Sequence, residues 1–186
     1  MHRLFGVILA VACAAGCVTA PGTRYYTLDM TRAAQDSPVN LVVDRLQASE
    51  ALTRKNILIK NTPTQVEYYA ADEWAADVAE MITQKLESEF GPRAEGRPTL
   101  LLSGTVLAFE QVDASGGAQA HARLALELRT ERGSRLDQPL LEKTYEVLLP
   151  AAAPQPNAVV VALGEGLEQI AAEIMADAAR VAPQAR

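Results

Sequence analysis

Few side chains in this sequence are suited to acid–base, nucleophilic or metal chemistry. Its 186 residues include only two histidines and two cysteines. Of the histidines, His121 alternates with apolar residues beside Arg123, which predicts a place on the solvated face of a strand. A general base needs an oriented partner, and the sequence shows none for His121. No His or Cys cluster has the spacing of metal ligands, so the sequence predicts no catalytic residue and no metal site.

Two other groups of residues suggest chemistry at first sight but fit a structural role better. The carboxylates of Asp77, Glu80, Glu87 and Glu89 fall between apolar residues at helical spacing, so we expect them on the wet side of a helix. The segment Gly164-Glu165-Gly166 lies in a helical pattern and lacks the preceding strand of a phosphate-binding loop. The net charge of −6 disfavours nucleic acid and anionic lipid surfaces as electrostatic partners.

The N-terminus contains the clearest chemical signal. A basic start is followed by an uncharged apolar run from Leu4 to Ala15, which is shorter than the roughly 20 residues of a membrane-spanning helix. Small residues then precede Cys17, and Gly16 stands directly before it. This region resembles a lipobox, where a signal peptidase cuts before a cysteine that carries diacylglyceryl and N-acyl chains. Cys17 is therefore the expected site of lipid attachment.

Two alternatives to this interpretation remain. Cys13 is a poorer candidate, because cleavage before Cys17 leaves the longer apolar run intact and places Gly16 at the cut. In an ordinary secretory signal Cys17 would be incidental, and a reactive thiol would be left at the mature N-terminus. Cleavage before Cys17 discards Cys13, so the mature chain would hold no disulfide, thiolate metal site or cysteine nucleophile.

Lipid attachment at Cys17 would divide the chain into three parts. These are a signal peptide over residues 1–16, a lipidated tether over residues 17–23 and a single domain over residues 24–186. At ~3.4 Å per residue the tether reaches at most roughly 24 Å, so the domain would stay close to its membrane. In lipoproteins of this class an Asp after the cysteine marks retention in the inner membrane. Val18 at this position therefore points to the periplasmic face of the outer membrane.

The mature chain reads as strands, a helix, three strands and a second helix. The first helix is expected to be opened by Trp74, with Asp72 as its N-cap and a stop at Gly91-Pro92. Gly104 marks a bulge or a close approach in a long strand. The sequence therefore predicts an α+β fold, a mixed and largely antiparallel sheet of five to seven strands with two amphipathic helices packed on it. The expected strands span residues 24–30, 39–46, 57–59, 66–69, 100–111, 120–129 and 141–149, and the second helix spans residues 161–175.

Three aromatic residues are candidates for contact with a partner or an acyl chain. Tyr68, Tyr69 and Trp74 cluster in sequence, and aromatic side chains are enriched at interface hot spots. Core packing is the default alternative, above all for Trp74 on an apolar helix face. Tyr68 and Tyr69 point to opposite faces of a strand, so both are core residues only if the sheet is covered on two sides.

Several segments in a fixed order resemble the ABC-type transport auxiliary lipoprotein family. This family includes the lipoproteins of paraquat-inducible operons and those that accompany MCE lipid transporters. The matching pieces are the lipobox, residues 25–28 (Tyr-Tyr-Thr-Leu), the stretch from Arg54 to Tyr69 with Val-Glu-Tyr-Tyr at residues 66–69, Trp74, residues 109–112 (Phe-Glu-Gln-Val) and an Ala-rich C-terminal helix. Ala76-Asp77 stand where the family usually has a Pro pair.

The resemblance implies a non-catalytic role in moving lipid or other hydrophobic molecules between two membranes. The implied partners are an MCE-domain protein and an inner-membrane transporter complex, with phospholipid and a second copy of the chain left open. No cofactor is implied beyond the lipid on Cys17. The alternative is a scaffold lipoprotein of envelope or cell-wall assembly that does not handle lipid.

Overall fold

The computed structural model describes residues 22–29, 37–132 and 137–185. The predicted signal peptide, Cys13, Cys17 and residues 17–21 of the tether lie outside these ranges and stay predictions. Within the described ranges, no helix is both long enough and apolar enough to cross a membrane.

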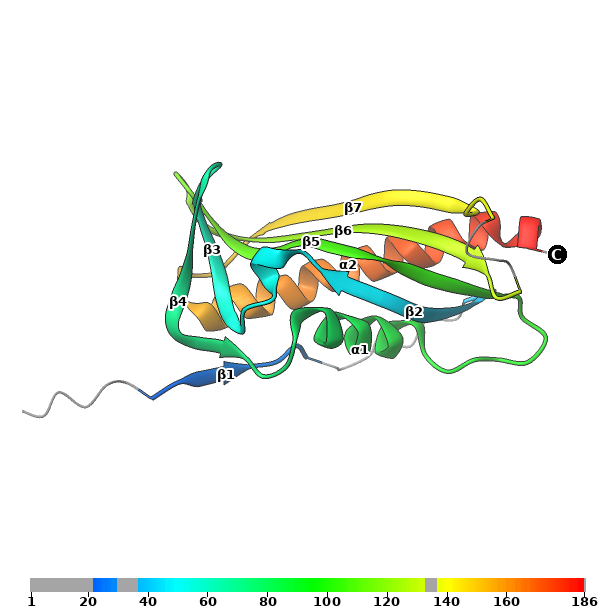
Figure 1. The fold of residues 1–186 in the computed structure, drawn as a ribbon, viewed down its shortest axis with the longest axis horizontal. Helices are drawn as coiled ribbons and strands as arrows, with labels where there is room; N and C mark the ends of the chain where they lie inside the picture. The colour runs from blue at the N-terminus through cyan, green and yellow to red at the C-terminus, as the bar shows by residue number, and fades with distance from the viewer. Residues whose placement is uncertain (1–21, 30–36, 133–136, 186) are drawn as a thin grey trace, which may run out of the picture.

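The described residues form seven strands and two helices, which confirms the expected α+β class (Figure 1). Short 3₁₀ turns follow the second strand, at Glu50–Leu52, and the second helix, at Ala182–Ala185. The strands are β1 (Arg24–Tyr26), β2 (Asn40–Ala48), β3 (Asn56–Thr62), β4 (Gln65–Trp74), β5 (Thr99–Ala114), β6 (Gly117–Thr130) and β7 (Leu141–Pro150), and the helices are α1 (Val78–Phe90) and α2 (Pro156–Val181).

The long strand β5 organises the sheet. One edge of β5 pairs with β6, which in turn pairs with β7, both antiparallel. Its other edge pairs in parallel with β2 along residues 99–106 and with β3 at Gln111 and Val112. The antiparallel β3–β4 hairpin therefore continues from one end of β5, and β1 adds to β4 in parallel. The sheet is mixed, as expected, with the order β1-β4-β3-β5-β6-β7 and β2 beside β5.

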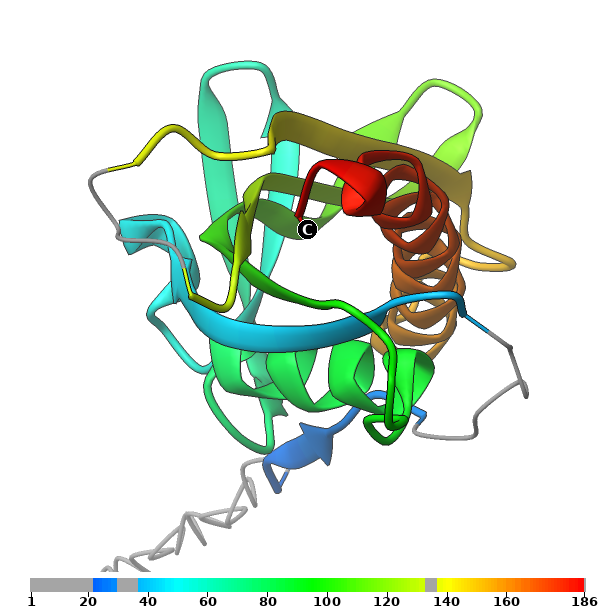
Figure 2. The same cartoon turned by 90° about the vertical axis from the view of Figure 1, so that its right-hand side faces the viewer.

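Both helices pack on the same face of this sheet (Figures 1 and 2). Alternate residues of β6, from Ala118 to Leu128, are buried on that face, as the sequence alternation predicts. Gly166 of α2 lies where an added Cβ would be 3.4 Å from Val147 of β7. Small residues thus let α2 approach the sheet closely, and the opposite face is covered by no described helix.

The start of α1 differs from the sequence prediction. Trp74 is the last residue of β4, and the helix begins at Val78 with Asp77 in the extended N-cap conformation. Asp72 is a strand residue that pairs with Arg24 instead of capping a helix. The reason is tertiary pairing, because the Trp74 N–H donates to the Lys55 carbonyl at 2.7 Å and β1 lies alongside. The predicted stop is confirmed, with Gly91 at φ 72°.

Gly104 marks a close approach between strands. A Cβ at this position would lie 2.1 Å from the carbonyl oxygen of Ala125 on β6, and the φ of Gly104 is +154°. The bulge in the β5–β6 ladder comes later, between Val106 and Ala108. Only glycine fits position 104 without moving the β6 backbone.

Candidate functional site

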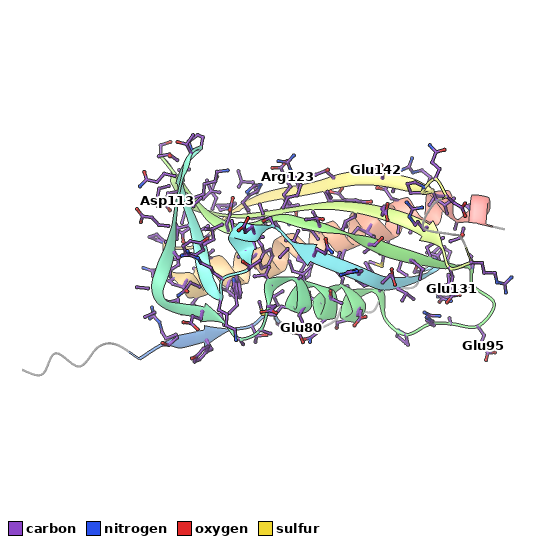
Figure 3. The ribbon with its side chains drawn as sticks, in the orientation of Figure 1. Glu80, Glu95, Asp113, Arg123, Glu131 and Glu142 are labelled. Atoms are coloured by element: carbon purple, nitrogen blue, oxygen red, sulfur yellow. The ribbon has the colours of Figure 1, made fainter. Side chains whose placement is uncertain are left out.

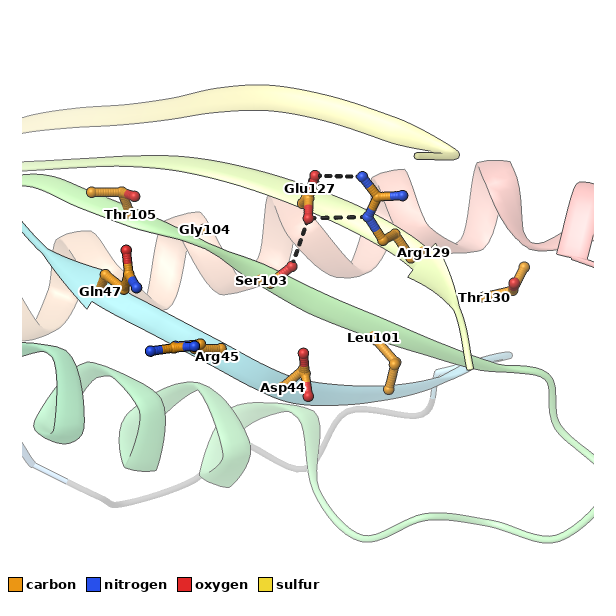
Figure 4. Close-up of a pocket in the computed structure, with 10 residues that line it drawn as sticks. All are labelled: Asp44, Arg45, Gln47, Leu101, Ser103, Gly104, Thr105, Glu127, Arg129 and Thr130. Atoms are coloured by element: carbon orange, nitrogen blue, oxygen red, sulfur yellow. Dashed lines mark hydrogen bonds and ion pairs between the residues drawn. The ribbon is translucent and has the colours of Figure 1, made fainter. Parts of the chain in front are cut away.

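The uncovered face of the sheet carries charged and polar side chains, among them the labelled Arg123 and Glu142 (Figure 3). A groove of about 280 Å³ runs across β2, β5 and β6 on this face (Figure 4). At its centre Glu127 accepts hydrogen bonds from the Ser103 hydroxyl at 2.9 Å and from two guanidinium nitrogens of Arg129, each at 3.0 Å. The central charges of the groove are therefore satisfied within the protein.

The hydroxyl of Ser103 in this groove is bonded to Glu127, and the same carboxylate is also held by Arg129. The lining of the groove includes serine and threonine hydroxyls, and its described residues contain neither histidine nor cysteine. Within the described ranges no group of three or more His, Cys, Asp or Glu residues is arranged to hold a metal ion. This arrangement is typical of a solvated sheet face that contacts partners through polar side chains.

A second, more apolar depression lies where the β3–β4 turn overhangs β5, β6 and β7; we call it the hairpin-end hollow. Its volume is about 630 Å³. Val112 and Leu148 contribute apolar side chains, and Leu148 is 49% exposed. The hollow is lined by Lys60, Asn61, Thr62, Pro63, Val112, Asp113, His121, Glu146 and Leu148.

His121, in this hollow, is not the solvated histidine that the sequence predicted. Its side chain is only 13% exposed and lies between two carboxylates, with Nδ1 3.2 Å from Glu110 and Nε2 2.8 Å from Glu146. The hydrogen bond with Glu110 raises the pKa of His121, burial opposes this, and the bond with Glu146 adds to the rise. Both ring nitrogens are engaged, so the ring is suited to holding a positive charge between carboxylates and poorly placed to accept a proton from a substrate.

Sequence reasoning missed this cluster because it depends on strand register. Glu110 of β5 lies directly opposite His121 of β6, and Glu146 of β7 lies opposite the next outward-facing residue of β6, Arg123. Alternation along one strand gives the face of each residue. The pairing between strands, which brings the three charges together, is set by the turn at residues 114–117 and by the bulge between Val106 and Ala108.

The three aromatic candidates have different environments. Trp74 is 1% exposed and its ring centroid lies 5.5 Å from that of Phe109, so it is a core residue. The Tyr68 hydroxyl donates to the Ala51 carbonyl at 2.9 Å, and the guanidinium of Arg54 lies 4.7 Å from the Tyr68 ring centroid. Both tyrosines are half-buried, which leaves part of each accessible to a partner.

Tyr69 packs toward the other side of β4, as the strand alternation predicts. Its hydroxyl donates to Gln111 Oε1 at 2.6 Å, and Gln111 in turn donates to Asp113 at 2.6 Å. Burial raises the pKa of Tyr69, so this hydroxyl stays protonated and remains a donor. None of the three aromatic candidates lines the hairpin-end hollow.

The described chain enters the domain through a salt bridge between β1 and β4. Arg24 Nε and Nη2 donate to the two carboxylate oxygens of Asp72 at 2.7 and 2.9 Å, and the Tyr26 hydroxyl donates to Asp72 at 2.8 Å. The Arg24 hydrogen bonds lower the pKa of Asp72 below its ordinary range, although burial opposes them. β1 therefore joins the domain at residues 72–74 of β4, the end of that strand away from the β3–β4 turn (Figure 1).

The match to a protein family covers most of the chain. A family model described as "ABC-type transport auxiliary lipoprotein component" matches residues 26–175. The chain belongs to this family. The matched range begins within β1 and ends in α2, so it includes the sheet, both faces and the hairpin-end hollow of this auxiliary lipoprotein.

Two solved structures resemble this auxiliary lipoprotein. Protein XCC0632 from Xanthomonas campestris is 19% identical with a TM-score of 0.72, and the match covers 87% of this chain and 98% of that one. A protein described as uncharacterized is 15% identical with a TM-score of 0.66, covering 84% and 99%. At such identities the likeness shows the fold alone. No curated protein matches the chain significantly.

Proposed function

We propose that this protein is the outer-membrane-anchored, non-catalytic auxiliary component of an ABC/MCE-type system that moves lipid between membranes. Membership in the ABC-type transport auxiliary lipoprotein family carries the proposal, because the match extends over nearly the whole described domain. Diacylglyceryl and N-acyl chains on Cys17 would supply the anchor, and an MCE-domain protein and an inner-membrane transporter complex would be the partners.

The attachment of β1 supports a role that depends on position. Because Arg24 and Tyr26 both bond to Asp72, the tether ends where β1 begins. A tether over residues 17–23 spans at most roughly 24 Å. The domain would then sit within a few nanometres of the bilayer and would act on whatever reaches that membrane.

The anchor is tested by fractionation of cells that express Cys17→Ser, with Cys13→Ser as the matched control. We expect Cys17→Ser to abolish the mature, membrane-fixed form and Cys13→Ser to leave it unchanged. Density separation of the two membranes then reports which one holds the wild-type protein. An unchanged distribution of Cys17→Ser, or wild-type protein in the inner membrane, would overturn the anchoring part of the proposal.

The partner is tested by crosslinking the lipoprotein in intact cells and purifying it. We expect an MCE-domain protein among the crosslinked products, and recovery of cell-wall assembly proteins without it would favour the scaffold alternative. Tyr68→Ala is expected to weaken this crosslink if Tyr68 lies in the interface. Tyr25→Ala is the matched control, because Tyr25 is 67% exposed on β1 and lies away from the Arg54–Tyr68 pair.

A further inference from the structure

We propose that the outer edge of β7 pairs with β7 of a second copy of this chain. The two sheets would join into one across a two-fold axis at Tyr145, with the two β7 strands antiparallel at the junction. The inference goes beyond the proposed function and uses neither the lipid anchor nor the transport partner.

β7 forms an open edge of the sheet. It is the last strand in the order β1-β4-β3-β5-β6-β7, and no other strand of the described residues pairs with its outer side. The strand at the opposite end, β1, has only three residues, whereas β7 has ten. An open edge carries N–H and C=O groups that can pair with a strand of another chain.

The strand register shows which backbone groups of β7 point outward. Opposite residues of an antiparallel pair alternate between those that exchange hydrogen bonds and those that do not. The Ala151 N–H donates to the Ala118 carbonyl at 2.9 Å, and these two residues continue the β6–β7 register by one step. Odd-numbered residues of β7 therefore bond to β6, and even-numbered residues direct their backbone groups outward. The even-numbered residues are all exposed: Glu142, Thr144, Glu146, Leu148 and Pro150.

β7 lacks most of the features that keep an exposed edge unpaired. Such edges are commonly protected by bulges, by proline within the strand or by lysine side chains. β7 pairs with β6 through ten consecutive residues without a register shift, whereas β2 and β4 each carry shifts. Pro150 is only its last residue, and Lys143 bonds to Asp177 of α2 at 2.8 Å. An edge of this length with so little protection indicates that another strand pairs with it.

The exposed side chains of β7 fit a second β7 in one register. A two-fold axis at Tyr145 places Glu142 opposite Leu148 of the second copy. It also places Thr144 opposite Glu146, and it pairs all four outward N–H groups, which gives about eight hydrogen bonds. An axis at Thr144 would instead oppose Glu142 to Glu146, and an axis at Glu146 would oppose that carboxylate to itself. Like charges directly opposite destabilise a sheet, so the charges select the Tyr145 register.

The helix-covered side of β7 contributes apolar residues to the same junction. Leu141, Val147 and Leu149 are half-buried on this side, and Leu141 and Val147 pack against the core. In the Tyr145 register Leu141 lies opposite Leu149 of the second copy. The apolar layer would therefore continue from one domain into the other, and the second copy would cover surface that one domain leaves half-exposed.

Disulfide crosslinking in intact cells tests the pairing and its register. Two full-length forms with different epitope tags are co-expressed, one with Thr144→Cys and the other with Glu146→Cys. Opposite residues of a hydrogen-bonded pair have Cα atoms ~5.5 Å apart, which is within the range of a disulfide. We expect an oxidant to join the two tags several-fold more than it joins Glu142→Cys to Glu146→Cys, the control pair that the Thr144 register would bring together. Each form expressed alone corrects for other thiols.

Thr144→Pro tests the backbone contact. The Thr144 N–H points outward, so proline removes a hydrogen bond to the second copy and leaves the β6–β7 ladder intact. Sedimentation equilibrium of the lipid-free mature chain, which carries Cys17→Ser, measures the association. We expect this chain to dimerise and Thr144→Pro to raise its dissociation constant by roughly tenfold or more. Thr144→Val keeps the N–H and is the matched control, and circular dichroism and the unfolding midpoint confirm that each variant is folded.

The outcomes separate this pairing from the proposed function. A chain that stays monomeric, a dimer that Thr144→Pro leaves unchanged, or equal crosslinking of the two cysteine pairs would overturn the pairing. A crosslink from Thr144→Cys to a different protein would assign the edge to another partner and would overturn the second copy. If anchoring and the MCE crosslink persist in these cases, the proposed function stands without the pairing. If both fail while the dimer forms in the Tyr145 register, the pairing stands alone.

Discussion

Lys85 allows a sharp test of how the two helices are held together. Its side chain is completely buried on α1, with Nζ 2.8 Å from Glu89 Oε1 and 2.7 Å from Glu168 Oε1 of α2. Burial alone would lower the pKa of Lys85, but the bonds with Glu168 and Glu89 outweigh it and the pKa is raised. The ammonium therefore stays charged inside the protein.

The two carboxylates differ in exposure, and this sets the expected magnitudes. The Glu89 side chain is 4% exposed, and its Oε1 has no other partner among the described residues. Lys85→Met would leave a buried, uncompensated carboxylate and should lower the free energy of unfolding by about 3–5 kcal/mol. The Glu168 side chain is 48% exposed, so Glu168→Gln should cost at most about 1 kcal/mol.

The double variant Lys85→Met/Glu89→Leu decides the argument. Removing both charges restores an apolar contact, and we expect stability within about 1 kcal/mol of the wild type or above it. Urea unfolding followed by circular dichroism measures each variant, with the m-value as a check that the transition is unchanged. The reasoning is refuted if Lys85→Met lowers the free energy of unfolding by less than about 1 kcal/mol. It is also refuted if the double variant loses as much stability as Lys85→Met and Glu89→Leu, each measured alone, lose together.

Three further predictions follow from single contacts. Gly104→Ala would place a Cβ 2.1 Å from the Ala125 carbonyl oxygen and should lower the free energy of unfolding by about 1–3 kcal/mol or more. Gly116→Ala is the control, because the space around its Cβ is open, and it should leave the free energy of unfolding nearly unchanged in the same urea experiment. Because the pKa of His121 is raised above 6.5 in the folded protein, the stability that its charged ring contributes is complete below pH 6.5 and is lost as pH rises through the raised pKa. In urea unfolding, the free energy of unfolding of His121→Gln should therefore fall less with rising pH than that of the wild type. If the wild type kept its free energy of unfolding as pH rises through the pKa of His121, the contacts of His121 with Glu110 and Glu146 would be contradicted. Because the pKa of Asp72 is lowered below 3.8, the stability that its carboxylate contributes is present above pH 3.8 and is lost as pH falls through the lowered pKa. Asp72→Asn should therefore speed hydrogen exchange at β1 at neutral pH and leave exchange at β6 unchanged. Equal protection of the β1 amides in the variant and the wild type would contradict the salt bridge.

The sequence predicted the elements well where a local period repeats over many residues. The alternation from Ala120 to Arg129 gave β6 and its buried face, and the helical spacing of apolar residues gave α2. Trp74 was misplaced because its apolar side chain continues the helical spacing of Val78 and Met81. Pairing of β4 with β1 and with the Lys55 carbonyl decided its conformation, and such non-local contacts leave no local pattern.

The candidate sites were harder to predict, because they are made between strands. Tyr68 and Tyr69 point to opposite sides as alternation requires, yet their partners, Ala51 and Gln111, are distant in sequence. The hairpin-end hollow has the same origin. Its apolar residues come from β5, β7 and the turn between β3 and β4, and only register brings them together.

The division between the two sheet faces restricts where any partner or lipid can bind. The helix-covered face is filled by core residues, and the buried Lys85 links α1 to α2, so access there would require unpacking the core. The charges at the centre of the groove around Glu127 are paired within the protein, so a partner would contact this groove through its solvated polar side chains. The hairpin-end hollow places Val112 and Leu148 beside the charged Lys60 and Glu146, and it lies by the β3–β4 turn, away from the end of β4 where β1 pairs. The uncovered face of the sheet is therefore the face of the described domain where a partner can bind without unpacking the core.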